Sequence, residues 1–371
     1  MKIYRLVLIA ILVITAASCE SSDESLDVEE LESSTELSNL QIMSYTEDFF
    51  QIDVQNGEVT YNNLSQTLEV TNQFKYVNYD SPSLEIFSGR GDDFSLYQSN
   101  LETKASNVIK GFCADEQDIR PRYGLIHNDR YFLLNEKYIG DSEKFELYLN
   151  QYAEGETDCS QFLLSESYHH GIEVVKQDQF LIIYYVDSQF KDRLLIYNLD
   201  TFKIIIDKQF LSSIYAICKV NEIEIVSIGD IATVYKYEDF SEVSTRSFYG
   251  GAFSNKPLIK NSETFNNKIV INRNSLGPSN FSSRPVILDL NTGELVDIEF
   301  DLLTNIQYNL RINKSYPVTL HSSRFDLKRE KIAIGYQVQD KEEYGVMWFD
   351  YNGEIVQDIP LELLPQIIFL D

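Results

Sequence analysis

Seven basic or imidazole side chains are the residues of this sequence whose positions suggest chemistry. Five of them directly precede predicted inner β-strands, and two lie at or just past the strand near residue 318. In a protein of net charge −27 all seven would form a local excess of positive charge. Such a group can bind a carboxylate or an acidic sugar. The residues are Arg120, Arg122, His169, His170, Lys256, His321 and Arg324. The alternative is a solvated surface on which they pair with nearby acids such as Asp115, Glu116 and Asp118.

No familiar catalytic motif accompanies these residues. The sequence has no nucleophile elbow of the GxSxG type, no HExxH and no Gly-rich phosphate-binding loop. Residues 289–294 (DLNTGE) resemble a calcium loop but lack its further acidic ligands, so we interpret them as a hairpin turn. Four scattered histidines indicate no metal centre, and we expect no cofactor. A binding role is therefore favoured over an enzymatic one.

The elements that must position these side chains are β-strands in a repeat. Residues 178–210 contain three consecutive strands, of which 180–186 is a continuous apolar run typical of a strand covered on both faces. Similar runs recur roughly every 40 to 60 residues, each preceded by a short strand and followed by a hairpin. The runs are 130–139, 179–187, 222–228, 268–272 and 331–338.

Four strands per repeat at this spacing are typical of the blades of a β-propeller. We therefore predict an all-β fold, a β-propeller of four-stranded antiparallel blades, with six blades and seven as the alternative. Five blades follow residue 123, and residues 46–107 are expected to form one or two more. The final apolar run, 365–370, should lie beside the first blade and close the ring, which removes an exposed edge. The starts of the inner strands would then gather at one mouth of the central channel.

The amino terminus predicts export and lipid attachment. Two basic residues precede nine apolar residues, which are too few to span a bilayer, and small residues follow up to Cys19. This order resembles the lipobox of bacterial lipoproteins, in which the cysteine is lipidated and becomes the first mature residue. The alternative is an ordinary signal peptide that contains a cysteine. We predict a signal peptide at 1–18 and attachment to the membrane through Cys19.

Residues 19–40 are the lipidated cysteine and a predicted disordered tether. From Glu20 to Leu40 the sequence has eight acidic residues and no Lys or Arg, so the segment should repel itself and stay extended. The acidic patch directly after Cys19 resembles the surface-export signal of Bacteroidetes lipoproteins, and a merely solvated spacer is the alternative. The predicted location is the outer membrane, on its periplasmic or its cell-surface face. Residues 41–371 are predicted to form a single propeller domain.

Composition limits the partners and the cysteine chemistry. The strongly acidic balance argues against nucleic acid as a partner. Cys113, Cys159 and Cys218 form no CxxC pair and no zinc spacing. An exported protein meets an oxidising compartment, so one disulfide with one remaining thiol is an alternative. Our expectation is that these cysteines are buried and free on strands, Cys218 above all.

The whole layout resembles that of the six-bladed β-propeller lipoproteins of Bacteroidetes. The resemblance covers the lipobox, the acidic tether and the blades, whose hairpins include residues 291–294 and 352–354. It is a resemblance of layout and implies no established reaction. The predicted function is a lipid-anchored cell-envelope propeller that acts as a binding or scaffolding module for a protein or glycan partner. The alternative is a propeller enzyme, a glycan lyase or hydrolase, with a cationic site at the channel mouth.

Overall fold

The computed structural model of the chain describes most residues that follow the predicted tether. The described residues are 37–69, 74–80, 83–90, 93–100, 103, 105–113, 119–139, 145–153, 159–210, 216–221, 224–228, 231–236, 238–247, 264–274, 283–293, 295–296 and 302–370. One compact unit spans Ser38–Asp371 and begins slightly before the predicted boundary at 41. The predicted signal peptide, Cys19, most of the predicted tether and Lys256 lie outside the described residues.

Ser38 belongs to the folded unit rather than to the predicted tether. Its hydroxyl donates a hydrogen bond to Asp326 Oδ2 at 2.6 Å, and Arg329 Nη1 donates to the same hydroxyl oxygen at 2.5 Å. Arg329 also pairs with Asp326 Oδ2 at 3.0 Å. The first strand then begins at Leu40. Polar contacts to a distant part of the chain therefore hold the start of the folded unit in place.

All described strand pairs are antiparallel, and the strands form six sheets. The first sheet has the order β27 (Ile367–Leu370), β1 (Leu40–Ser44), β2 (Phe50–Gln55), β3 (Glu58–Asn63). The second sheet has the order β4 (Phe74–Asp80), β5 (Ser83–Arg90), β6 (Asp93–Asn100), β7 (Ser106–Lys110). A seven-stranded sheet contains β14 (Lys203–Phe210), β13 (Asp192–Asn198), β12 (Phe180–Asp187), β11 (Ser160–Gln177), β10 (Phe145–Ala153), β9 (Arg130–Tyr138) and β8 (Ile119–His127). Each of the last three sheets has its strands in chain order. The first of them contains β15 (Ala216–Asn221), β16 (Glu224–Ile228), β17 (Ile231–Lys236) and β18 (Glu242–Ser247), and the next contains β19 (Thr264–Phe265), β20 (Lys268–Asn274), β21 (Ser283–Asp289) and β22 (Leu295–Val296). The last contains β23 (Val318–Asp326), β24 (Lys331–Val338), β25 (Glu343–Asp350) and β26 (Ile355–Leu361).

The long strand β11 is shared by two halves of the seven-stranded sheet. Its part from Ser160 to Tyr168 pairs with β10, and its part from Tyr168 to Gln177 pairs with β12. Divided at Tyr168, the sheet consists of two four-stranded units, β8 to β11 and β11 to β14. With the five other sheets, the described strands form seven four-stranded units. This grouping favours the alternative of seven blades over six, and the number of blades remains a prediction.

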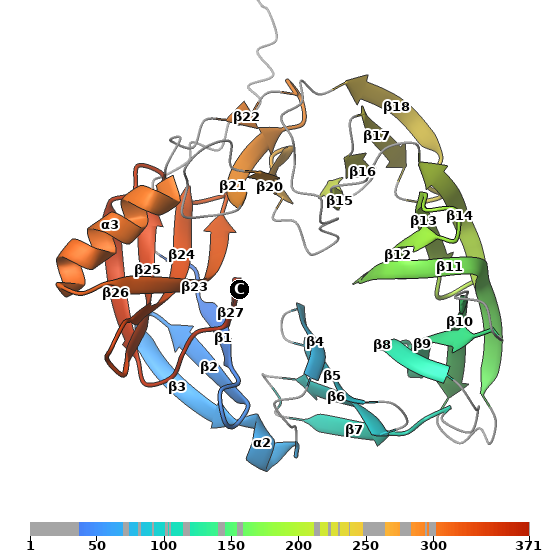
Figure 1. Ribbon diagram of the computed structural model, residues 1–371, viewed down its shortest axis with the longest axis horizontal. Coiled ribbons are helices and arrows are strands. Elements are labelled where there is room, and N and C mark those ends of the chain that lie inside the picture. Colours follow the sequence, from blue (N-terminus) through green and yellow to red (C-terminus); the bar gives the residue numbers. More distant parts are fainter. Residues whose placement is uncertain are drawn as a thin grey trace, which may run out of the picture. The chain divides into compact units, whose positions relative to one another are not determined.

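The two ends of the folded unit meet in the first sheet. β27 pairs with β1, so that Leu40 lies opposite Leu370 and Ile42 lies opposite Ile368. This pairing confirms the prediction that the final apolar run lies beside the first sheet, where it covers an exposed strand edge. The four-stranded units follow one another in chain order around a ring (Figure 1). The unit Ser38–Asp371 is therefore a β-propeller, as predicted.

The apolar core lies between neighbouring units. In β12, Phe180 and Ile182 pack into one cluster of buried side chains, whereas Leu181 and Ile183 pack into another. All four side chains are completely buried. Because successive strand residues point to opposite faces, a strand covered on both faces needs an unbroken apolar run. This confirms the interpretation of residues 180–186.

Two helices occur among the described residues, and the repeat pattern predicts neither of them. They are α2 (Leu64–Thr67) and α3 (Leu302–Lys314). α3 precedes the last sheet and lies on its outer side (Figure 1), with Ile306 and Leu310, one helical turn apart, buried in the core of that sheet. Its last turn carries Arg311 and Lys314, where positive charge is favoured. Neither helix has the length and apolar character needed to cross a bilayer.

Cys113 and Cys159 form a disulfide, with their Cα atoms 5.6 Å apart. Cys113 follows β7 of the second unit and Cys159 directly precedes β11, so the bond links the second unit to the third. The expectation of free cysteines is wrong for this pair, because the fold brings together two positions 46 residues apart. Cys218 lies on β15, as predicted.

Candidate functional site

Two terms describe the ends of each unit. The first strand is the one that comes first in chain order, and its amino end is the end at which the chain arrives. The turn end is the opposite end, where the first strand turns into the second. In Figure 1 the first strands β4, β8 and β23 border the middle of the ring.

An irregular register recurs in the amino-terminal half of three first strands. Lys75 is skipped where β4 pairs with β5, Arg122 where β8 pairs with β9, and His321 where β23 pairs with β24. Each skipped residue lies five positions before the last paired residue of its strand, and these last residues are Asp80, His127 and Asp326. Such a β-bulge turns a side chain out of the regular alternation and is common next to binding sites. The three units therefore place a basic or imidazole residue at an equivalent bulge.

On β8 the bulge brings two predicted site residues to one carboxylate. Arg120 lies opposite Glu136 of β9, with its Nη1 atom 3.9 Å from Oε1, and Arg122 donates a hydrogen bond to the same oxygen. Although burial alone would lower the pKa of Arg122, the hydrogen bond and the charge of Glu136 raise it above its usual value. The Glu136 side chain is 2 % exposed, whereas the Arg120 side chain is 64 % exposed. One buried carboxylate thus positions two guanidinium groups and leaves positive charge at the surface.

Aromatic rings lie beside these arginines. The Arg120 guanidinium is 5.9 Å from the ring centre of Phe145. Phe145 lies opposite Tyr138 and Tyr168 in the register, with ring centres 5.4 and 6.1 Å away. Tyr138 is 43 % exposed, whereas Tyr168 is buried. Burial, together with the charge of Glu136, raises the pKa of Tyr168, so this phenol stays protonated at neutral pH.

His169 and His170 lie where β11 passes from the third unit to the fourth. The register against β12 skips His169 and is irregular again between His170 and Glu173. The two imidazoles contact each other through their Nδ1 atoms, and the Phe190 ring centre lies 4.8 Å from that of His169. Gly171 has φ +70°, a conformation that favours glycine, so this passage depends on its missing side chain.

The remaining predicted residues lie elsewhere. His321 is exposed, and its Nε2 atom is 3.2 Å from Gln337 Oε1 of the same sheet. Arg324 lies further along β23, two positions before its last residue, Asp326. Arg324 is therefore near the turn end of β23 and not at its amino end. Lys256 is outside the described residues.

The contacts of the described residues thus join the predicted site residues in two pairs, the arginines of β8 and the histidines of β11. In the described part of the chain, no contact links these pairs to each other or to His321. The structure adds partners that the sequence reasoning missed: Glu136, Tyr138 and Phe145. Glu136 lies within the run 130–139, which was interpreted as an apolar strand. Its role depends on lying opposite Arg120, which residue spacing does not reveal. We call Arg120, Arg122, Glu136, Tyr138 and Phe145 the amino-end group.

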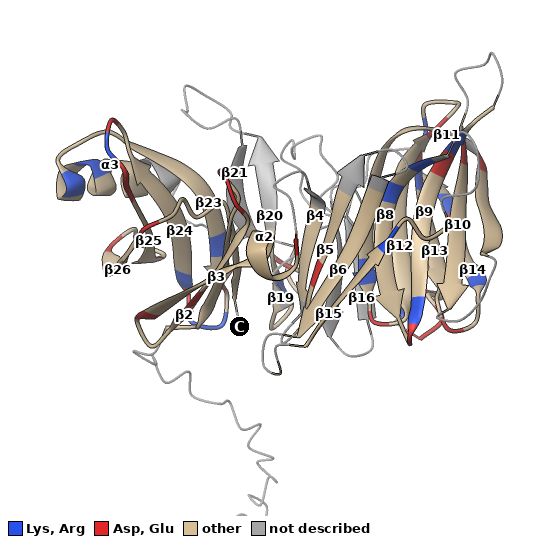
Figure 2. Ribbon diagram, turned by 90° about the horizontal axis from the view of Figure 1, so that it is seen from below, with Lys and Arg blue, Asp and Glu red and all other residues tan. Residues whose placement is uncertain are grey.

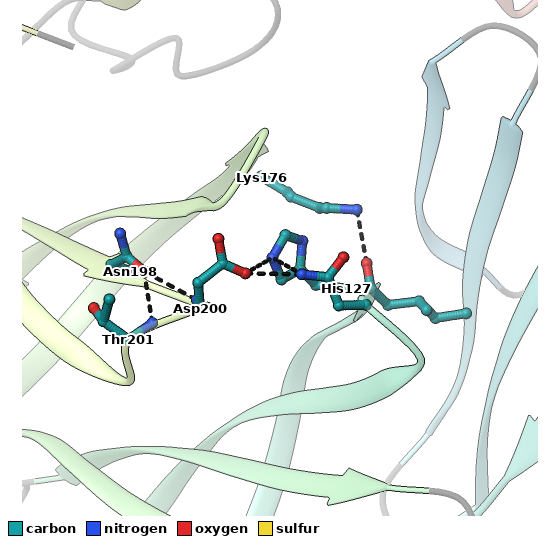
Figure 3. A network of polar contacts seen from close by, with 7 residues as sticks. His127, Lys176, Asn198, Asp200 and Thr201 are labelled. Carbon is teal, nitrogen blue, oxygen red and sulfur yellow. Dashed lines mark hydrogen bonds and ion pairs between the residues drawn. The ribbon is translucent and has the colours of Figure 1, made fainter. Parts of the chain in front are cut away.

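A separate polar network lies at the turn end of the third and fourth units (Figure 3). His127 Nε2 and Asp200 Oδ1 are 2.8 Å apart, and Asn128 Nδ2 donates a hydrogen bond to the same oxygen at 2.8 Å. Asn198 Oδ1 accepts hydrogen bonds from the backbone N–H groups of Asp200 and Thr201, which holds the β13–β14 turn. The network therefore joins the β8–β9 turn to the β13–β14 turn.

Lys176 connects three units at this end. From β11 its Nζ atom donates a hydrogen bond to the backbone oxygen of Ile126 on β8 at 2.7 Å, and it lies 3.8 Å from Glu85 Oε1 on β5. Tyr123 of β8 and Tyr76 of β4 stack with ring centres 4.1 Å apart. Burial, with a further contribution from the Glu85 charge, raises the pKa of Tyr123. The turn end uses its polar groups to hold neighbouring units together.

Basic and acidic residues are interspersed along the described strands (Figure 2). Across the described ranges, no group of three or more His, Cys, Asp and Glu side chains is arranged to hold a metal ion. In the amino-end group, by contrast, an exposed guanidinium and an exposed aromatic ring flank the same phenylalanine. That arrangement can bind an anion with an apolar face.

Comparison with known proteins gives structural neighbours but no family. No family model and no curated protein matches the chain. Similar solved structures include a quinoprotein alcohol dehydrogenase-like protein from Bacteroides thetaiotaomicron, with 10 % identity, a TM-score of 0.47 and coverage of 90 % of this chain and 78 % of that chain. Another is the β-propeller domain of the Trilobed protease from Pyrococcus furiosus (12 % identity, TM-score 0.42, coverage 77 % and 85 %). A third is a periplasmic gluconolactonase from Pseudomonas aeruginosa (12 % identity, TM-score 0.43, coverage 89 % and 97 %). Because these TM-scores are below 0.5, the likenesses carry no argument about function.

Proposed function

We propose that the protein is a lipid-anchored cell-envelope β-propeller that binds an anionic protein or glycan partner at the amino ends of its first strands. The observation that carries this proposal is the recurring bulge, at which Lys75, Arg122 and His321 occupy equivalent positions. The chain as a whole has 58 acidic and 31 basic residues, so a basic or imidazole residue at three equivalent positions is unusual for its composition. Local positive charge in an acidic protein selects for anionic partners.

The location in the cell envelope is proposed from the amino-terminal sequence. A lipidated Cys19 would hold the propeller at the outer membrane, on its periplasmic or cell-surface face, by a tether that ends near Ser38. The layout shared with the propeller lipoproteins of Bacteroidetes supports this location. Metabolic labelling with an alkyne analogue of palmitate tests it: the wild type should carry label and the Cys19→Ser chain should carry none. Equal labelling of both chains would contradict lipid attachment at this residue.

Anion binding is tested with the purified full chain and two polymers, polygalacturonate and neutral dextran. We expect binding of the acidic polymer only, with an affinity that falls as salt is added, because charge pairing at an exposed site is screened. The double variant Arg122→Ala/His321→Ala should bind at least fivefold more weakly. The matched control is Lys203→Ala, an exposed lysine on the outer strand β14. A double variant that binds like this control would show that the amino ends are not the site.

A propeller enzyme, a glycan lyase or hydrolase, is the alternative function. The contacts among Arg122, Glu136 and Tyr168 bring together residue types that proton-transfer chemistry uses. The raised pKa and the burial of Tyr168 oppose its use as a base at neutral pH, and Glu136 is already occupied by Arg122. The geometry therefore supports binding better than catalysis. Incubation with polygalacturonate, followed by ultraviolet detection of an unsaturated product, would reveal lyase activity.

A further inference from the structure

We infer that the amino-end group is a subsite for a carboxylated sugar ring, in which Arg120 pairs with the carboxylate and Tyr138 stacks on the ring. This inference rests on the proposed anion-binding function and names the class of ligand. It assigns a site to residues of one unit, the third, rather than to the amino ends in general.

Arg120 has positive charge to offer to a ligand. Glu136 carries one negative charge, and Arg122 already donates a hydrogen bond to its Oε1 atom. Arg120 is at 3.9 Å from that oxygen, the far limit of an ion pair, and most of its side chain is exposed. Among these three side chains, the two guanidinium groups exceed the one carboxylate by about one unit of positive charge. A guanidinium is planar and presents paired N–H donors that match the two oxygens of a carboxylate.

An aromatic surface lies beside the Arg120 guanidinium. The Phe145 ring contacts the Arg120 guanidinium on one side and the Tyr138 ring on another, with the planes of the two rings at 62°. Phe145 is half-buried and Tyr138 is exposed. An exposed tyrosine offers an apolar ring and a polar hydroxyl at low entropic cost, which suits a ligand that is itself partly apolar and partly polar.

Paired strands hold the amino-end group in place. Glu136 is buried on β9 directly opposite Arg120, and Phe145 is opposite Tyr138 across the β9–β10 pair. The residues therefore stand on paired strands rather than on a loop, so their spacing is set before any ligand arrives. Rigid placement of this kind improves affinity because less freedom is lost on binding.

These features favour a sugar acid over other anions. A simple anion such as polyphosphate needs only the positive charge and gains nothing from Tyr138. In nucleic acid the negative charge is on the phosphates and not on the ring that would stack, so it does not offer Arg120 and Tyr138 a carboxylate and a ring in one unit. A uronic acid has a carboxylate attached to a ring with an apolar face, and so it can use Arg120 and Tyr138 together.

The test is a titration of the full chain with oligogalacturonate, with the neutral galactose oligomer of equal length and with polyphosphate. Arg120→Ala should weaken binding of both acidic probes at least tenfold. Tyr138→Ala should weaken oligogalacturonate binding at least fivefold and leave polyphosphate binding unchanged, and Tyr138→Phe should restore it because the ring is kept. Tyr308→Ala, which removes an exposed tyrosine on α3, is the control. Circular dichroism and thermal unfolding of each variant establish that it is folded.

The outcomes separate this inference from the proposed function. If Tyr138→Ala binds oligogalacturonate as the wild type does, or if the neutral oligomer binds equally well, the sugar-acid subsite is wrong, although anion binding by Arg122 and His321 can still hold. If polyphosphate and oligogalacturonate bind with equal affinity in every variant, the site recognises charge alone and the subsite is again overturned. If neither acidic probe binds the wild type, both proposals fail.

Discussion

The two ends of the third unit use charged residues in opposite ways. At the turn end, Lys176 reaches residues of two neighbouring units, and Asp200 of the fourth unit accepts contacts from the β8–β9 turn. At the amino end, Arg120 and Arg122 both meet Glu136 within one sheet, and Arg120 stays exposed. The same residue types therefore hold units together at one end and present charge to solvent at the other.

This difference shows that the place of a charge along a strand decides its use. Between units a charged group loses hydration and must be paired with a partner from the adjacent sheet, so its removal lowers stability. Near the amino end of β8, by contrast, Arg120 keeps most of its hydration and contributes little to folding. Stability should therefore depend on links between units, and ligand binding on the amino ends. Three predictions test this division.

The disulfide between Cys113 and Cys159 is a covalent link between the second and third units and should give the largest of the three effects. Its removal by the double substitution Cys113→Ser/Cys159→Ser frees a loop spanned by 46 residues. The chain-entropy relation for a loop of this size gives a loss of about 4 kcal/mol in the free energy of unfolding. Urea unfolding followed by tryptophan fluorescence measures it, with Cys218→Ser as the control. An unchanged midpoint in the double variant would show that this link does not stabilise the fold.

Lys176→Met and Arg120→Met form a matched pair of substitutions at the two ends. The Lys176 side chain is 22 % exposed beside Glu85, whose side chain is 6 % exposed, so its loss leaves a buried carboxylate without this ammonium group. We expect Lys176→Met to cost about 2–3 kcal/mol in the free energy of unfolding, and Arg120→Met to cost less than about 0.5 kcal/mol. Both are measured by urea unfolding. Equal losses would remove the distinction between the two ends.

The smallest expected effect is at the His127–Asp200 contact, which is partly open to solvent. A double-mutant cycle with His127→Ala and Asp200→Ala should give a coupling free energy of about 0.5–1 kcal/mol. The same cycle between Asp200 and Arg120, which lie at opposite ends of the units, should give no coupling. A coupling of zero for the first pair would mean that this contact does not join the two turns in solution.

Much of the fold follows from short-range patterns in the sequence. The run at 180–186 is apolar without interruption because both faces of β12 are covered, and this pattern predicted a strand in the right place. The final strand was predicted from the apolar run at 365–370, and β27 lies there. α3 was missed because it occurs once, between two sheets, and a search for a repeated strand pattern passes over it.

The candidate site was predicted less well, for a physical reason. Arg120, Arg122, His169 and His170 were predicted as site residues because they precede predicted strands, and His321 because it lies at or just past one. The structure places Arg120 and Arg122 on β8 and His321 on β23. Arg324 lies near the turn end of β23. The sequence did not show this, because the length of a strand depends on its partner and not on its own residues alone.

By itself the sequence determined the repeated strand pattern, the acidic composition and the positions of its rare positive residues, because these are properties of neighbouring residues along one chain. Only the tertiary structure decided which of them meet. The skipped register at Arg122 turns it onto the carboxylate of Glu136, and the pairing of β9 with β10 sets Tyr138 beside Phe145. A contact of this kind depends on which strands are paired and in what register, and the hydrogen bonds between the paired strands settle both.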